Sequence, residues 1–174
     1  LALLVANAGI PGRQGALDAT PEVARHVMAV NYLGLVHVTR ALWPALVAAR
    51  GSVVNVCSVA GTVAVPSAAP YSASKHAALA WSRALAAQAR RVGVHVLTVN
   101  PGPVATPGFP QADLRRHRLA RRTVISDARC ADAIVRGLDR GRGEIYVPAW
   151  WRAAAILQVL LPGTVARLSG RVRP

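Results

Sequence analysis

Tyr71 and Lys75 lie four residues apart in the stretch "YSASKHAALAWSRAL", which has a helical pattern. On a helix this spacing places the two side chains on one face. A free tyrosine has a pKa of about 10, and a nearby ammonium favours its phenolate form, so Lys75 could bring Tyr71 toward the range useful for acid–base catalysis. Taken alone, the pair is equally compatible with an isolated lysine exposed to solvent.

Lys75 is also the single lysine among the 21 Lys and Arg residues of the chain. The Arg guanidinium is large and delocalised, whereas the Lys ammonium is a compact point charge with three hydrogen-bond donors. A site that needs a small cation beneath a tyrosine, and donors for the hydroxyls of a sugar, would select Lys even in an Arg-rich sequence. The residue type therefore favours a functional interpretation of the pair.

Further polar residues and glycines stand where apolar, strand-like runs end. Asn7-Ala8-Gly9 follows the first run, Ser58 follows the second, and Pro101-Gly102 follows the third. Asn31 lies within a helical pattern ("VNYLG"), where an amide has no propensity advantage. Because open α/β sheets bind ligands beyond the carboxyl ends of their strands, the sequence predicts a site formed by these residues together with the helical pair.

Short apolar runs alternate with longer helical patterns, which is typical of a parallel sheet with crossover helices. The first run lacks polar alternation, so it is predicted to be a strand buried on both faces. The predicted strands cover residues 1–6, 52–57, 94–100 and 143–148. The predicted helices cover residues 21–50, with an internal break left open, and residues 71–91, 126–140 and 150–161. The predicted fold class is therefore α/β with a parallel sheet.

The helix boundaries carry local signals. Thr20, followed by proline and glutamate, and Ser126 are predicted N-caps. Gly51 and Gly93 are predicted to end the helices that precede them, and Pro162-Gly163 is predicted to break the last helix. The four prolines within residues 101–110 exclude regular structure there, and the Arg-rich run that follows, residues 114–122, is predicted to be a short helix.

Composition indicates one globular domain. The chain has 174 residues, with 53% hydrophobic and 16% charged side chains, so it can bury a core. No apolar stretch reaches the roughly 20 residues of a membrane span, and no signal-peptide pattern is found. The two cysteines, Cys57 and Cys130, form no disulfide framework and no metal-ligand spacing is present, so we expect a reduced, cytoplasmic setting and no metal site.

The formal net charge of +14 raises nucleic acid as a partner. The basic residues are spread along the chain apart from the run 114–122, and no RNP-like strand, zinc-finger spacing or basic zipper accompanies them. Nucleic-acid binding is therefore disfavoured against an Arg-biased composition. The run itself is interpreted as a solvated helix face, with recognition of an anionic substrate such as an acyl thioester as the alternative.

The ordered set of motifs resembles the short-chain dehydrogenases/reductases. The family's NAG element, "VNxxG" asparagine, serine, YxxxK and "PGxVxT" elements correspond in order and spacing to Asn7-Ala8-Gly9, Asn31, Ser58, Tyr71 with Lys75, and Pro101 to Thr106. A lone YxxxK is weak evidence, whereas five elements in register are specific. The resemblance spans roughly residues 1–147 and implies a Rossmann-like, three-layer αβα parallel sheet.

The resemblance implies an NAD(P)-dependent oxidoreductase that transfers hydride between nicotinamide and a carbonyl or secondary alcohol of a small molecule. Tyr71 would be the acid or base, and Ser58 would hydrogen-bond the reacting oxygen. Lys75 would lower the pKa of Tyr71 and bind the nicotinamide ribose, and Asn31 would hold a water that relays protons. The implied cofactor-binding residues are Asn7, Ala8, Gly9, Tyr71, Lys75, Pro101, Gly102, Val104 and Thr106. NAD and NADP both remain open.

The chain also departs from the family, because no Gly-rich phosphate loop occurs in it. We therefore expect an N-terminally truncated member that holds about four strands, with its first strand open at the edge and NAD(P)H bound weakly. Residues 1–149 would be a partial NAD(P)-binding domain, and residues 150–174 an apolar helix and basic tail of the same domain. The alternative function is a non-catalytic remnant or binding protein with this fold.

Interactions beyond the substrate follow from the same resemblance. The full-length protein is expected to form a homo-oligomer. The apolar C-terminal helix could pack on its own domain, on a second subunit or on a membrane surface. Residues 107–124 occupy the position of the family's substrate lid.

Overall fold

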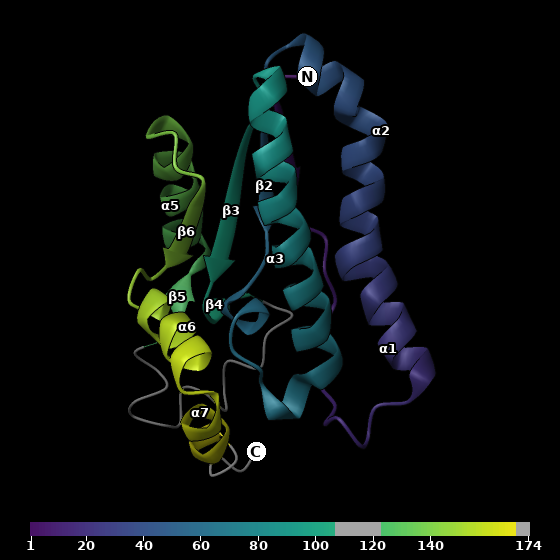
Figure 1. The fold of residues 1–174 in the computed structure, drawn as a ribbon, viewed down its shortest axis with the longest axis vertical. Coiled ribbons are helices and arrows are strands. Elements are labelled where there is room, and N and C mark those ends of the chain that lie inside the picture. The colour runs from purple at the N-terminus through teal and green to yellow at the C-terminus, as the bar shows by residue number, and fades with distance from the viewer. Residues whose placement is uncertain (107–122, 170–174) are drawn as a thin grey trace.

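Four parallel strands form the centre of the molecule, a computed structural model that describes residues 1–106 and 123–169 (Figure 1). The sheet has the order β1-β2-β3-β6, and each neighbouring pair is parallel. The strands are β1 (Leu3–Ala6), β2 (Ser52–Val56), β3 (His95–Pro101) and β6 (Glu144–Val147). This agrees with the predicted number and direction of strands.

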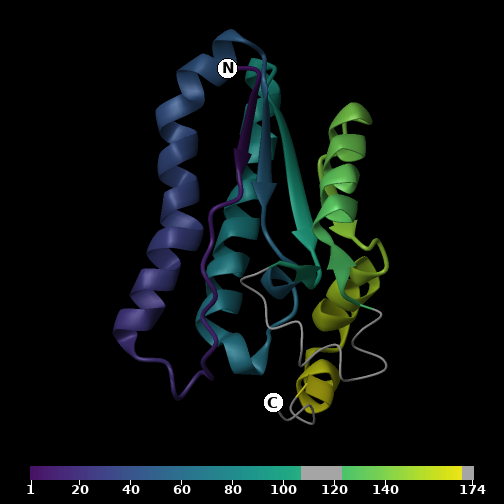
Figure 2. The same ribbon diagram turned by 180° about the vertical axis from the view of Figure 1, so that it is seen from behind.

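Helices cover both faces of the sheet, because successive strand residues point to opposite sides. Val53 and Val96 pack with residues of α2 and α3, including Leu46 and Ala89. Val54, Leu97 and Val99 pack on the other face with Cys130 and Ile134 of α5. The result is three layers, with α2 and α3 on one side and α5 on the other (Figures 1 and 2). The Rossmann-like αβα class is therefore confirmed.

The first helical segment changes its winding at Asn31. It consists of α1 (Pro21–Met28), a π-helical turn (Ala29–Leu33) and α2 (Gly34–Ala48). Thr20 caps α1 as predicted, accepting a hydrogen bond from the Val23 amide at 3.4 Å. Because π-turns inside helices often occur at functional sites, the position of Asn31 within this one is informative.

The second long helix and its boundary also match the sequence. Helix α3 (Ala69–Ala89) follows a short 3-10 turn (Pro66–Ala68) and ends in another (Arg90–Val92). Gly93, at the end of this segment, takes the left-handed conformation with φ 75°. Glycine adopts this conformation easily, and it commonly ends a helix. After α2, however, the left-handed residue is Arg50, φ 46°, and not the predicted Gly51. Gly51 is needed for a different reason, since a Cβ there would collide with the carbonyl oxygen of Leu1.

One expectation about an irregular segment was wrong. Within residues 101–110, β4 (Val104–Ala105) pairs with β5 (Ile125–Ser126) in a small parallel sheet. The neighbouring prolines flank this pair of residues without removing its amides, so a short ladder can form. Pro162-Gly163 breaks the apolar helix as predicted, since that helix ends at Leu160. A further helix that was not expected, α7 (Pro162–Ser169), begins at the proline, because proline is accommodated in the first turn of a helix.

The described residues of the C-terminal half form two more helices. Ser126 caps α5 (Asp127–Asp139) as predicted, accepting from the Arg129 amide at 3.1 Å. Helix α6 (Trp151–Leu160) follows β6. The Arg-rich run 114–122 lies outside the described residues, as does most of the expected lid. In the part of the chain that is described, no helix is long and apolar enough to span a bilayer, and both cysteines are buried free thiols.

Candidate active site

The predicted site residues gather at one end of the sheet. In Figure 2 the arrowheads of β1, β2 and β3 point toward the same end, as parallel pairing requires. Asn7 follows β1, Ser58 lies two residues beyond β2, and Pro101 closes β3. Helix α3 brings Tyr71 and Lys75 to this end. The topology thus collects residues that are far apart in the sequence.

Lys75 is buried, with 4% of its surface exposed. Its Nζ donates a hydrogen bond to the carbonyl oxygen of Val56 at 2.9 Å and lies 5.8 Å from the centroid of the Tyr71 ring. Burial lowers the pKa of Lys75 because it disfavours the charged ammonium. The interpretation of Lys75 as an isolated exposed lysine is therefore excluded.

Tyr71 interacts with Ser58, whose side chain lies beside the end of β2. Burial raises the pKa of Tyr71, and a hydrogen bond with the Ser58 hydroxyl opposes this rise without cancelling it. Ser58 is itself 8% exposed and accepts a hydrogen bond from the Ala60 amide at 3.1 Å, which starts the 3-10 turn Val59–Gly61. The structure thus places the hydroxyl groups of Ser58 and Tyr71 in one site.

The pKa of Tyr71 is raised, whereas the sequence predicted that Lys75 would lower it. The ammonium is 5.8 Å from the ring centroid and donates to Val56, whereas burial acts on the phenol directly. Desolvation of the phenolate therefore outweighs the attraction of the ammonium in this structure.

Asn31 clamps the loop that follows β1. It is 2% exposed, and its Oδ1 accepts a hydrogen bond from the Ile10 amide at 2.8 Å. Its Nδ2 donates to the Ile10 carbonyl oxygen and to Ser74 Oγ, both at 3.0 Å. Both amide hydrogens are therefore engaged, and the side chain fixes the Asn7-Ala8-Gly9 loop against α3.

Ser74 is a site residue that the sequence reasoning missed. It is fully buried, accepts from Asn31 and donates to the Tyr71 carbonyl oxygen at 2.8 Å, so it joins the clamp to the helix that carries the tyrosine. A small hydroxyl residue directly before Lys75 was the available signal. On its own, a serine in a helix carries too little information to be selected.

The residues expected near a cofactor fall into two groups. Asn7, Ala8 and Gly9 are exposed, and a Cβ on Gly9 would lie 3.3 Å from Asn31 Oδ1 and 3.6 Å from Lys75 Nζ. Glycine therefore leaves a space beside the ammonium that a side chain would fill. Lys75 uses one of its three N–H donors on Val56, which leaves donors for the hydroxyls of a ribose. These features fit a dinucleotide at this edge.

The second group is the segment from Pro101 to Thr106, which contains β4. The indole of Trp151, the first residue of α6, packs against Gly102 so closely that a Cβ on this glycine would collide with Nε1. That indole N–H is buried and has no hydrogen-bond partner in the described residues. The sequence indicated an apolar C-terminal helix but not that its first residue would contact this loop.

A parallel α/β domain with a buried lysine beside a serine–tyrosine pair at its strand ends defines a Rossmann-like domain with a Ser–Tyr–Lys site. Among residues 1–106 and 123–169, no three His, Cys, Asp or Glu side chains could hold a metal ion. A family model described as "short chain dehydrogenase" matches residues 1–116. The chain therefore belongs to the short-chain dehydrogenase/reductase family.

Individual relatives agree with this assignment. A short-chain dehydrogenase from Burkholderia cenocepacia, solved in complex with NADP, has a TM-score of 0.82 and 34% identity over 100% of this chain and 70% of that one. A short-chain dehydrogenase from Mycobacterium paratuberculosis, bound to NAD, has a TM-score of 0.67 and 30% identity over 78% of this chain and 56% of that one. Both similarities support the common fold.

A curated relative extends the similarity along nearly the whole chain. Dehydrogenase/reductase SDR family member 7B from Bos taurus is 31% identical in an alignment of 174 positions that covers 95% of this chain and 54% of that protein. The Xenopus laevis protein of the same name is 42% identical over 105 residues, or 60% of this chain and 32% of that protein. The chain therefore spans about half the length, or less, of these relatives.

Proposed function

We propose that this protein is an NAD(P)-dependent oxidoreductase that interconverts a carbonyl and a secondary alcohol, with Tyr71 as the general acid or base. The observation that carries the proposal is the set formed by the buried Ser58 and Lys75 and the half-buried Tyr71 at the carboxyl ends of the strands. Family membership and the solved relatives that hold NADP or NAD support a nicotinamide cofactor. The proposal covers both cofactors.

Tyr71 would transfer the proton. In the reduction direction its hydroxyl donates to the developing alkoxide, and in the oxidation direction its phenolate accepts the proton of the alcohol. Ser58 would donate a hydrogen bond to the same substrate oxygen and so stabilise the charge that develops there. The hydrogen bond between Ser58 and Tyr71 supports this role, since both hydroxyls can then reach one oxygen atom.

Lys75 would serve both the tyrosine and the cofactor. Its buried ammonium lies 5.8 Å from the Tyr71 ring centroid and would stabilise a phenolate there. Its remaining donors, with Asn7, Ala8, Gly9 and the segment containing Pro101, Gly102, Val104 and Thr106, would hold the nicotinamide end of the cofactor. The nicotinamide, when bound, supplies or accepts the hydride.

Asn31 is proposed as a positioning residue. Because both of its amide hydrogens bond to Ile10 and Ser74, a proton-relaying water on this side chain would have only the second lone pair of Oδ1. Its contacts instead support a role in holding the loop after β1 at the correct distance from Lys75.

The decisive variant is Tyr71→Phe, which removes the hydroxyl and keeps the ring. We expect turnover to fall by roughly 10³-fold or more, while dinucleotide affinity, measured by fluorescence titration, changes little. Tyr32→Phe is the matched control, since it removes another tyrosine hydroxyl from the helical segment that carries Asn31. Activity that survives Tyr71→Phe would contradict the assigned acid. Dinucleotide binding without turnover in the unaltered protein would favour the non-catalytic alternative.

A further inference from the structure

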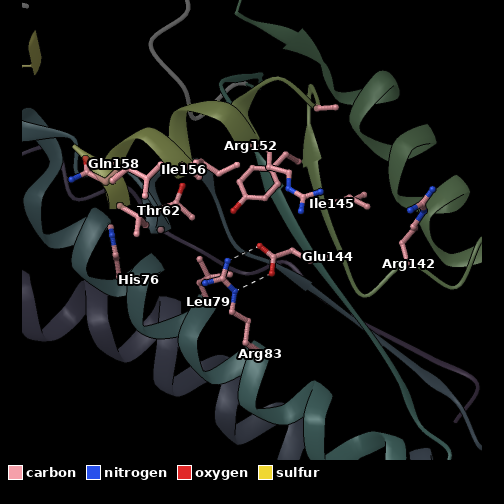
Figure 3. Close-up of a pocket in the computed structure, with 16 residues that line it drawn as sticks. Thr62, His76, Leu79, Arg83, Arg142, Glu144, Ile145, Arg152, Ile156 and Gln158 are labelled. Atoms are coloured by element: carbon pink, nitrogen blue, oxygen red, sulfur yellow. Dashed lines mark hydrogen bonds and ion pairs between the residues drawn. The ribbon is translucent and has the colours of Figure 1, made fainter. Parts of the chain in front are cut away.

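A second concave region lies between α3, β6 and α6, apart from the Ser–Tyr–Lys site (Figure 3). The α3–β6–α6 groove has a volume of about 830 Å³, which is within the range of small-molecule sites. None of Asn31, Ser58, Tyr71 and Lys75 lines it. Its principal wall residues are Leu79, Arg83, Glu144, Arg152, Ile156 and Val159.

An ion pair spans one side of the groove and is internally neutral. Arg83 of α3 donates from Nε and Nη2 to the two carboxylate oxygens of Glu144, at 2.9 and 2.8 Å. Glu144 also accepts a hydrogen bond from Asn100 Nδ2 at 2.9 Å. The carboxylate is therefore compensated by its own partners and does not need a second cation.

Arg152 supplies an uncompensated charge on α6, beside the apolar wall, and Arg142 lines the groove as well. The Arg152 side chain extends from α6, and its guanidinium forms no hydrogen bond or ion pair with any described residue, although Glu144 lines the same groove (Figure 3). A guanidinium presents a planar fork of donors that suits a carboxylate. The molecule also carries a net charge of +14, which favours the approach of anions. This end of the groove is therefore a receptor for one negative group.

The rest of α6 offers an apolar wall. Ile156, Val159 and Leu160 line the groove and keep 51%, 78% and 70% of their surfaces exposed. Across from them, the buried Leu79 of α3 lines the groove, whereas the Ile145 side chain packs toward α5 on the other face of the sheet. Apolar side chains so arranged around a concave region are typical of a binding surface. A ligand that matches both ends must combine one negative charge with an aliphatic body.

We propose that the α3–β6–α6 groove binds an aliphatic carboxylate, with the carboxylate on Arg152 and the alkyl chain along Ile156 and Val159. A small inorganic anion would leave the apolar wall uncovered. Of the three arginines that line the groove, Arg83 is paired with Glu144, and a polyanion such as nucleic acid on Arg142 and Arg152 would leave the apolar wall uncovered. The site is separate from the proposed reaction and does not depend on it.

The test is calorimetric titration of the purified protein with decanoate, below its critical micelle concentration. We expect one site per chain, and an affinity that rises by about twofold to fourfold for each methylene added from octanoate to decanoate. Arg152→Gln should weaken binding by about tenfold, since it removes a charge-assisted hydrogen bond. Val159→Gln should weaken it about threefold or more. Both side chains are exposed, so folding should not suffer.

Two variants on the opposite layer serve as matched controls. Arg136→Gln and Val135→Gln make the same chemical changes on exposed positions of α5, away from the groove. They should leave decanoate binding unchanged, and Tyr71→Phe should do so as well. Loss of turnover in Tyr71→Phe with unchanged decanoate binding would separate this proposal from the proposed function.

Several results would overturn the proposal. Equal weakening by Arg152→Gln and Arg136→Gln would mean that decanoate responds only to net charge. If decanoate showed no saturable binding, or if affinity did not depend on the length of the alkyl chain, aliphatic carboxylates would be ruled out as the ligand. If Val159→Gln instead abolished self-association, or binding to anionic vesicles, with no effect on decanoate, the groove would be an interface with a second copy or a lipid surface.

Discussion

Burial acts on both members of the Tyr71–Lys75 pair and favours the neutral form of each. It raises the pKa of the phenol and lowers the pKa of the ammonium. The hydrogen bond with Ser58 reduces the effect on Tyr71, and the contact with Val56 gives the ammonium a partner. The tyrosine is therefore protonated at neutral pH, the form that a general acid requires.

The pH dependence of the two reaction directions follows from this state. Because the pKa of Tyr71 is raised above its ordinary value, the hydroxyl keeps its proton through neutral pH, and the rate of carbonyl reduction should stay constant there. Alcohol oxidation needs the phenolate, so its rate should rise with pH across the measured range. Both pH profiles are measured as initial rates of reduction and of oxidation, at saturating cofactor, from pH 6 to 10. A reduction rate that already falls between pH 7 and 8 would contradict the raised pKa.

The sequence predicted which residues form the candidate site better than it predicted their pKa values. Tyr71, Lys75 and Ser58 could be selected because their spacing and order are specific. The direction of the tyrosine's pKa could not be predicted, since it depends on how much of the side chain the fold buries. Ser74 and Trp151 were missed for a related reason: their roles rest on contacts with Asn31 and Gly102, across 43 residues for the first pair.

A polar link joins three elements of the fold beside the site. Arg83 of α3 binds Glu144 of β6, and Glu144 accepts from Asn100, which directly precedes Pro101 at the end of β3. Helix α3 carries Tyr71 and Lys75, and β3 leads into the proposed cofactor segment. The link therefore holds α3 and that segment to β6.

Glu144→Gln tests the link by its dependence on pH. Burial alone would raise the pKa of Glu144, but Arg83, Tyr146 and Asn100 outweigh it, and the pKa is lowered. A lowered pKa in the folded state adds stability above the unfolded value of about 4.5, and this stability is lost as the pH falls through the folded value. The variant should therefore be less stable at pH 7, by about 1 kcal/mol for a partly exposed pair.

Urea unfolding at pH 7 and at pH 3 measures the difference in free energy of unfolding between the unaltered protein and Glu144→Gln. This difference should be smaller at pH 3, because a protonated Glu144 resembles glutamine. Glu22→Gln is the control, since the Glu22–Arg25 pair is exposed on both sides and joins residues of a single helix. It should change stability less than Glu144→Gln. A constant difference between the unaltered protein and Glu144→Gln at both pH values would rule out a contribution from the charge.

The order of the main helices and strands could be predicted from the sequence, but the π-turn and the β4–β5 ladder could not. Thr20 and Ser126 cap helices through local side-chain bonds, which a sequence displays directly. Asn31, within the π-turn, bonds to Ile10 and Ser74, and the β4–β5 ladder pairs Val104 with Ile125. Features decided by distant partners carry no local signal, so they become visible only in the folded chain.

At the scale of the described residues as a whole, one edge of the sheet, at β1, is apolar. In the described part of the chain β2 is the only strand that pairs with β1, and Leu3 and Val5 remain 43% and 49% exposed. Register places Val5 beside Val54, on the face that α5 covers farther along the sheet. That cover does not extend to β1. An apolar strand open on its edge and on one face is prone to pair with another chain.

The 174-residue chain should therefore associate in a concentration-dependent way, and Val5→Lys should reduce this association severalfold, because a charge on an edge strand opposes intermolecular pairing. Static light scattering over a dilution series measures the effect. Val92→Lys is the matched control: Val92 is 42% exposed on the turn after α3, and the change adds the same charge without touching the strand. Equal reduction by both variants would assign the effect to net charge, and a monomeric unaltered chain at the same concentrations would show that the open edge of β1 does not drive association.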